Sequence, residues 1–162
     1  VSVVIHPQSL IHSLVKYRDG SILAQMANPD MRIPIAAALG FPARLTSGAR
    51  SLDVAEIGQM TFAEPDEKRY PCLRLARLAA EAGGTVPVVL NAANEEAVQA
   101  YCDDRIRFTE IYQLVDQTMQ RLEPEQSTAL EDVLRIDRKA REVAQALLCE
   151  TESPFSKQVA SL

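Results

Sequence analysis

The sequence contains no tryptophan and only four phenylalanine and four tyrosine residues in 162 residues. Its hydrophobic content of 47% must therefore come mainly from Leu, Ile, Val and Ala. These side chains suit close packing between helices, and the shortage of rings argues against an aromatic-rich β-sandwich core. We therefore expect a core built largely by helices.

The sequence also lacks an excess of basic residues. Lys and Arg number 17 against 22 Asp and Glu, which gives a net charge of −5 and a pI near 5.1. Such a chain has no positive field to attract a phosphate backbone, so we expect no nucleic-acid partner. No apolar run approaches the roughly 20 residues that span a bilayer, and no charged-then-apolar leader is present. We expect a cytoplasmic protein with no membrane partner.

Motifs that would carry chemistry are likewise missing. The three cysteines, Cys72, Cys102 and Cys149, form no C-x-x-C motif and have no metal-ligand spacing, so we expect buried free thiols. No Gly-rich phosphate loop or G-x-S-x-G elbow occurs. Val1 stands where a start methionine would be and leads directly into a strand pattern, so we expect a piece of a longer protein.

The first third of the sequence has the pattern of a β-hairpin. Residues 2–6 predict a short buried strand that Pro7 ends. The pair Asp19-Gly20 lies between two apolar stretches and predicts a two-residue turn with positive φ at both positions. Both faces of this hairpin carry apolar side chains, so we expect a second copy of the chain or another domain to cover it.

The turn fixes the register that we expect. A two-residue loop pairs Tyr17 with Ile22 on one face and His12 with Ala27 on the other. After the hairpin, Asp30 is expected to cap a helix over about residues 31–39. A turn-rich connector then contains one possible strand at residues 59–64.

Beyond residue 67 the apolar pattern changes to the helical period. We predict four helices: from Pro71 to Gly83-Gly84, over residues 88–102, from a Thr109 cap to Leu122, and up to about Cys149. The fold class is therefore α+β, a β-hairpin sheet layer followed by a C-terminal four-helix bundle. The predicted divisions are residues 1–66, residues 67–150 and a disordered tail at residues 151–162.

The two histidines and the adjacent acid pairs are the candidate catalytic or metal-binding residues of the sequence. His6 and His12 lie on either side of Pro7 with no acidic residue between them, which argues against a shared metal site. Each alone is either a hydrogen-bonded sheet residue or an acid-base group, and the residues leave both interpretations open. Neighbours such as Glu95 and Glu96 point about 100° apart on a helix, so we expect solvated carboxylates.

Several ordered segments resemble one enzyme family. "IHPQSLIHSLVKYRDGSILAQ", "NPDMRIPIA", "LDVAEIGQMTFAEPDEKRYPCLRLA", "LNAANEEAV", "IRFTEI" and "LEDVLRIDRKARE" are similar to the C-terminal part of 1-deoxy-D-xylulose 5-phosphate reductoisomerase. The resemblance extends to about residue 150. It implies an oxidoreductase and isomerase of the methylerythritol phosphate pathway of isoprene biosynthesis, which produces 2-C-methyl-D-erythritol 4-phosphate and is the target of fosmidomycin.

The resemblance also implies partners and cofactors. The full-length enzyme is NADPH-dependent, binds Mn²⁺ or Mg²⁺, and is a homodimer whose contact the hairpin sheet would supply. The dinucleotide loop, the acidic metal ligands and the phosphate-binding residues of the family all belong to a missing N-terminal portion. We therefore expect this chain alone to bind neither cofactor nor metal and to be inactive.

Four residues carry the site implied by the family. His12 matches the active-site histidine, Ser9 lies on the adjoining turn, and Pro29 and Met31 match residues that line the substrate and nicotinamide pocket. No metal ligand is carried over. The alternative hypothesis is a non-catalytic binding or assembly module that shares the sheet and the helices.

Overall fold

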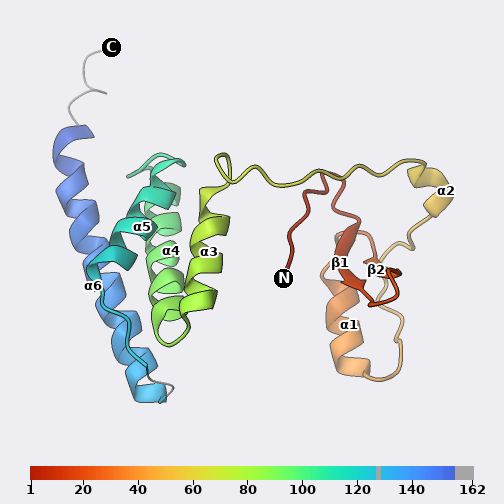
Figure 1. The fold of residues 1–162 in the computed structure, drawn as a ribbon. Coiled ribbons are helices and arrows are strands. Elements are labelled where there is room, and N and C mark those ends of the chain that lie inside the picture. The colour runs from red at the N-terminus through yellow and green to blue at the C-terminus, as the bar shows by residue number, and fades with distance from the viewer. Residues whose placement is uncertain (127–128, 156–162) are drawn as a thin grey trace, which may run out of the picture. The chain divides into compact units, whose positions relative to one another are not determined.

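The computed structural model describes residues 1–126 and 129–155, and Figure 1 traces their fold. The chain divides into two compact units, Val1–Pro65 and Asp66–Leu162. The first unit contains a two-stranded antiparallel sheet and two helices, and the described part of the second unit is helical. The architecture is therefore α+β with a helical C-terminal part, as the sequence indicated.

The hairpin forms, but its register differs from the prediction by one residue. Strand β1 (Ile11–Lys16) pairs with β2 (Ile22–Met26), with Val15 opposite Leu23 rather than Ala24. A one-residue shift exchanges the faces on which the partner side chains lie. The predicted pairs, including Tyr17 with Ile22 and His12 with Ala27, are therefore wrong.

The turn explains the shift. The N–H of Gly20 donates to the carbonyl of Tyr17 (3.2 Å), and the N–H of Tyr17 donates to the carbonyl of Ser21 (2.9 Å). The loop thus holds three residues, with positive φ at Gly20 (+89°) but not at Asp19. Asp19 instead accepts hydrogen bonds from the N–H and the hydroxyl of Ser21. A three-residue loop of this kind places one extra residue in the turn.

The strand predicted at residues 2–6 does not form. Ile5 alone pairs, with Ala63, through two backbone hydrogen bonds of 2.8 and 3.0 Å. Val3 and Val4 are exposed rather than buried. The possible strand at residues 59–64 likewise reduces to this single bridge, because in the described part of the chain no further strand pairs beside it.

Two helices follow the hairpin in the first unit. Helix α1 (Arg32–Gly40) begins one residue later than predicted, with Met31 at the N-cap position. Asp30 still contributes, since its carboxylate accepts the N–H of Arg32 at 3.0 Å. Helix α2 (Val54–Ile57) was not predicted; the Asp53 side chain caps it.

The second unit contains α3 (Pro71–Ala82), α4 (Val86–Cys102), α5 (Glu110–Arg121) and α6 (Leu130–Phe155). Proline opens α3 and Gly83 ends it, as predicted. Helix α6 continues to Phe155, so residues 151–155 are helical where a disordered tail was expected. The rest of that predicted tail, residues 156–162, lies outside the described residues.

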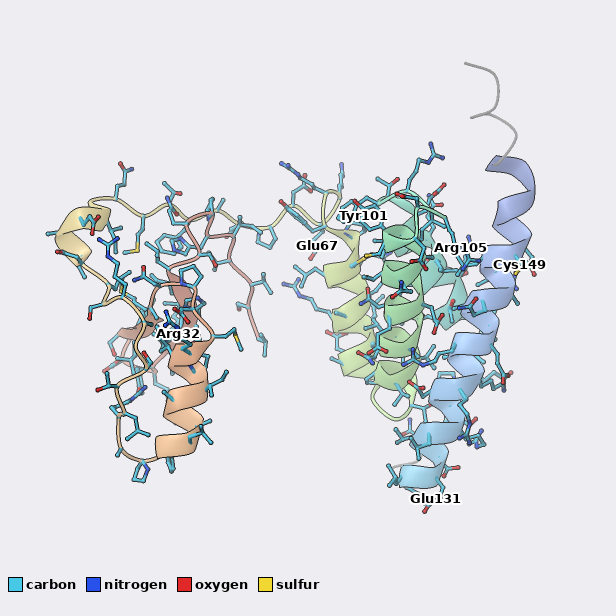
Figure 2. The ribbon with its side chains drawn as sticks, turned by 180° about the vertical axis from the view of Figure 1, so that it is seen from behind. Arg32, Glu67, Tyr101, Arg105, Glu131 and Cys149 are labelled. Carbon is cyan, nitrogen blue, oxygen red and sulfur yellow. The ribbon has the colours of Figure 1, made fainter. Side chains whose placement is uncertain are left out.

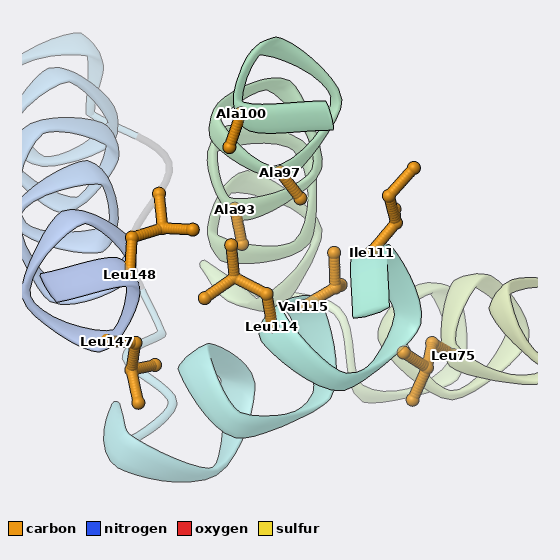
Figure 3. Packing of buried hydrophobic residues seen from close by; sticks show 9 residues of the cluster. All are labelled: Leu75, Ala93, Ala97, Ala100, Ile111, Leu114, Val115, Leu147 and Leu148. Carbon is orange, nitrogen blue, oxygen red and sulfur yellow. The ribbon is translucent and has the colours of Figure 1, made fainter. Parts of the chain in front are cut away.

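The core of this unit lies where α4, α5 and α6 meet. Figure 3 shows leucines from α5 and α6 directed towards small residues of α4. The buried alanines of α4 allow the close approach, and the fully or nearly buried side chains include Ala93, Ala97, Ala100, Leu114, Val115, Leu147 and Leu148. On α5 the buried residues recur at the helical period and form one face: Ile111, Leu114, Val115 and Thr118.

Two predictions about side chains of this unit are wrong. All three cysteines are exposed, because each lies on a helix position that faces away from the alanine-rich core. Glu95 and Glu96 are not merely solvated: Arg141 reaches both, at 2.6 and 3.2 Å. Glu95 and Glu96 point in different directions from α4, but a long arginine side chain that comes from a neighbouring helix can reach both carboxylates.

Among the described residues, no helix has the length and apolarity needed to cross a membrane.

Candidate functional site

A cleft of about 540 Å³ lies in the first unit. The end of the hairpin, the turn after it and the first turns of α1 form its wall. Its lining residues are His12, Gln25, Ala27, Asn28, Pro29, Asp30, Met31, Ile33, Pro34, Ala37 and Arg44. The structure therefore brings His12 to one cavity with Pro29 and Met31, which follow it by 17 and 19 residues in the sequence.

A β-bulge places His12. Ile11 pairs with Met26 and Ser13 with Gln25, so His12 is an extra residue with no partner on β2. Bulges re-aim side chains and are common beside active sites. The ring of His12 is exposed and accepts or donates no hydrogen bond within the described part of the chain. The hydrogen bond expected of a sheet histidine is thus not found among the described residues, and no described residue occupies either ring nitrogen.

The turn that carries Pro29 is fixed by hydrogen bonds. The N–H of Asp30 donates to the carbonyl of Asn28 at 2.8 Å. The side-chain amide of Asn28 donates to the carbonyl of Arg50, also at 2.8 Å, which ties the turn to the connector. Ala27, just before the turn, is buried. These contacts hold Pro29 and Met31 on the same side as His12.

Asp30 and Arg32 form a closed ion pair at the rim of the cleft. The Arg32 guanidinium donates three hydrogen bonds to the two carboxylate oxygens, at 2.6 to 3.1 Å. These bonds, followed by the backbone N–H of Arg32, lower the pKa of Asp30 to about 2. Asp30 is therefore ionised near neutral pH and already paired, which makes it a poor general base.

Ser9 lies apart from the residues that line the cleft. It has a positive φ of 51° and donates its N–H to the carbonyl of His6 (3.0 Å). The same turn is held to the connector, because the Gln8 side chain bonds Thr61 and the His6 ring contacts the Thr61 carbonyl. The ring of His6 stacks on Phe62 at 4.7 Å between centroids. His6 therefore packs in this turn through its Nδ1 and its ring face, while its Nε2 is buried and has no hydrogen-bond partner among the described residues.

Several lining residues were missed in the sequence. Ile33 and Ala37 lie four residues apart on one face of α1, just after the wall residue Met31, so helical spacing could have predicted them as lining residues. Arg44 could not have been found in this way. It follows the end of α1 and enters the cleft only because the chain turns back at that point.

The described residues differ in how well they suit the two cofactors that the resemblance implies. Among the described residues, His, Cys, Asp and Glu nowhere form a group of three that could hold a metal ion. The described residues by themselves therefore do not fit a divalent metal. The apolar wall made by Pro29, Met31 and Pro34 is, in contrast, the kind of surface that accepts one face of a flat ring.

Comparison with known sequences identifies the family. Residues 26–143 match the family model described as DXP reductoisomerase C-terminal domain. The 1-deoxy-D-xylulose 5-phosphate reductoisomerase of Stutzerimonas stutzeri is 57% identical over 144 residues, which are 89% of this chain and 36% of the relative. The enzyme of the same name from Nitrosomonas eutropha is 51% identical over 148 residues, 91% of this chain and 36% of the relative.

Solved structures agree. The reductoisomerase of Zymomonas mobilis in complex with NADPH superposes with a TM-score of 0.84 and 47% identity, over 91% of this chain and 39% of that one. A DOX-P reductoisomerase structure with fosmidomycin and magnesium superposes with a TM-score of 0.81 and 39% identity, over 93% of this chain and 40% of that one. The chain thus spans little more than a third of the relatives' length. It belongs to the 1-deoxy-D-xylulose 5-phosphate reductoisomerase family and corresponds to the C-terminal part of its members.

Proposed function

We propose that this chain is the C-terminal portion of an NADPH- and divalent-metal-dependent enzyme that converts 1-deoxy-D-xylulose 5-phosphate to 2-C-methyl-D-erythritol 4-phosphate. The observation that carries the proposal is the cleft. It gathers the unpaired ring of His12 and the apolar residues Pro29 and Met31 in a chain that belongs to this family. An apolar wall excludes water from a reacting centre, which favours hydride transfer over side reactions.

Within this site His12 is the proposed catalytic residue. Its ring has no competing hydrogen bond in the described part of the chain, so it is free to donate to or accept from a polar group of the substrate. Pro29 and Met31 supply the pocket wall, and Ser9 is proposed for the rim of the pocket in the full-length enzyme. NADPH, when bound, supplies the hydride. No step is assigned to the metal, whose ligands we place in the missing N-terminal portion.

The proposal includes two kinds of partner. The missing N-terminal portion completes the pocket, and a second copy of the chain docks on the hairpin sheet to form a homodimer. Large apolar side chains are exposed on both faces of this sheet: Leu14 and Ile22 on one, Val15 and Leu23 on the other. An isolated two-stranded sheet is marginal in water, so both faces gain from being covered.

Two further parts of the proposal concern the chain itself. We propose that the helical unit is organised as a four-helix bundle that supports the catalytic unit. We also propose that the isolated chain is inactive, because the described residues supply neither a metal site nor a dinucleotide loop. Residues 1–66 then form the end of the catalytic and dimerisation domain.

The experiment that tests the proposal is substitution of His12 in the full-length enzyme. His12→Ala should lower kcat/KM for the sugar phosphate at least tenfold, a loss of about 1.4 kcal/mol of transition-state stabilisation. Ser13→Ala, the next residue of β1, is the matched control and should leave kcat/KM within about twofold. Unchanged kinetics in the His12 variant would make this residue a plain part of the sheet.

A further inference from the structure

The turn between β2 and α1 is closed by the ion pair of Asp30 and Arg32, and Met31 lies inside that closure. The Asp30 carboxylate accepts the backbone N–H of Arg32 at 3.0 Å and three hydrogen bonds from its guanidinium at 2.6 to 3.1 Å. One carboxylate thus binds both the main chain and the side chain of Arg32, which leaves the residue between them little freedom. The pair therefore fixes the backbone that carries Met31.

Packing contributes little to this turn within the described part of the chain. Helix α1 has no buried residue, and the Met31 side chain is 71% exposed although it lines the cleft. A methionine side chain has three rotatable bonds, so its position at the cleft depends on the backbone that carries it. Hydrogen bonds of the turn, rather than buried neighbours, therefore set the position of this part of the wall.

The stability of the fold does not explain why Asp30 and Arg32 pair so closely. The Arg32 side chain is 60% exposed. Exposed ion pairs add little to the free energy of folding, because water screens the charges and the ordering of long side chains costs entropy. Asp30 nevertheless directs four hydrogen bonds to this one residue, and its pKa of about 2 keeps the carboxylate charged at neutral pH. The contact serves the geometry of the turn.

We propose that Asp30 is a positioning residue for the reaction, which holds Arg32 and thereby sets where Pro29 and Met31 stand at the reacting centre. The inference rests on the proposed function, in which this wall excludes water from hydride transfer. Asp30 acts through the turn and takes no part in proton transfer. Because a displacement of about 1 Å can cost up to about 100-fold in rate, loosening the turn should slow the chemical step more than it weakens binding.

The first test is steady-state kinetics of the full-length enzyme. Asp30→Ala should lower kcat about tenfold and change KM for NADPH and for the sugar phosphate by less than about threefold. Asp30→Asn keeps an oxygen that can accept the Arg32 N–H but loses the charge, so it should recover part of the lost kcat.

Glu56→Ala is the matched control for these variants. It removes another exposed arginine–carboxylate pair of the first unit, in which Arg50 and Glu56 lie 2.6 Å apart, and Glu56 does not line the cleft. The kcat of this control should stay within about twofold of the parent, because an exposed pair away from the wall has no effect on the reacting centre.

Two further readouts separate positioning from a merely structural role. With NADPH that carries deuterium at the transferred position, the isotope effect on kcat should be larger in Asp30→Ala than in the parent, because hydride transfer becomes the slow step. The double variant Asp30→Ala, Arg32→Ala should be within about twofold of the slower single variant, because both substitutions break the same contact. Losses that multiply in the double variant, or a kcat of Asp30→Ala within twofold of the parent, would overturn the inference.

Hydrogen exchange tests the contact without any activity. The amides of residues 31–35 should exchange about tenfold faster in Asp30→Ala than in the parent and in Glu56→Ala, while the hairpin amides keep their rates and show that the unit is folded. A full-length parent without reductoisomerase activity would refute the proposed function, and the exchange rates would still decide whether Asp30 holds the turn. Equal rates in the three folded proteins would overturn the inference.

Discussion

Leu114 is the central test of how the helical unit is held together. Its side chain is 6% exposed and lies on α5 between the alanines of α4 and the leucines of α6 (Figure 3). The prediction is that Leu114→Ala destabilises this unit strongly. The alanines opposite have no side-chain atoms with which to fill the space, so the cavity left by the substitution should remain largely open.

The magnitude follows from the atoms removed. Leu→Ala deletes three carbon atoms, and each buried methylene-sized group contributes about 0.8 kcal/mol, which gives roughly 2.4 kcal/mol before any cavity is counted. A cavity of even about 40 Å³ would add roughly 1 kcal/mol. We therefore expect a loss of about 3 to 4 kcal/mol in the free energy of unfolding.

Urea unfolding of the 162-residue chain, followed by far-ultraviolet circular dichroism, measures this loss through the helical signal. Leu134→Ala is the matched control, because Leu134 lies inside α6 but is 50% exposed. Its loss should stay below about 1 kcal/mol. Equal losses for the two variants with unchanged m-values would refute the packing argument and place the apolar face of α5 in water.

The remaining predictions concern polar groups of the helical unit, whose side chains Figure 2 draws as sticks on the ribbon. Thr85→Val should cost about 1 to 2 kcal/mol in urea melts, because the buried hydroxyl accepts the N–H of Glu125 (3.0 Å) and that donor would lose its partner. Thr118→Val should cost less than half as much, since its hydroxyl only donates to a helix carbonyl that remains bonded; a reversed order would contradict the argument. The Arg141 guanidinium, followed by Asn91, lowers the pKa of Glu95 below its ordinary value of 4.5. The associated stability is present above pH 4.5 and lost as the pH falls below it, so Arg141→Gln should flatten the decrease in urea midpoint between about pH 6 and pH 3.5; parallel curves would show that the ion pair adds nothing.

Helix positions in the second unit could be predicted closely because their causes are local. Pro71 pre-sets a helical start, Gly83 supplies the positive φ of +65° at the end of α3, and the apolar spacing on α5 marks its buried face. The exposure of the cysteines could not be predicted in this way. Burial of a residue such as Cys149 depends on which face of a helix the neighbouring helices cover.

The hairpin of the first unit shows the same difference between features with local causes and features that depend on other contacts. Asp19-Gly20 correctly predicted a turn, but the hydrogen bonds of Ser21 and Tyr17 decided between a two-residue and a three-residue loop. That single residue changed the register of the whole sheet and, with the bulge at His12, the environment of the proposed catalytic ring.

The sequence by itself determined the fold class, the family and the positions of most helices, because periodicity, caps and ordered motifs are properties of neighbouring residues. Only the tertiary structure decided that His12, Pro29 and Arg44 line one cleft and that Arg141 joins two helices. These contacts join residues whose separation in the chain says nothing of their separation in space. The chain's return after α1 and the close packing on α4 bring them together.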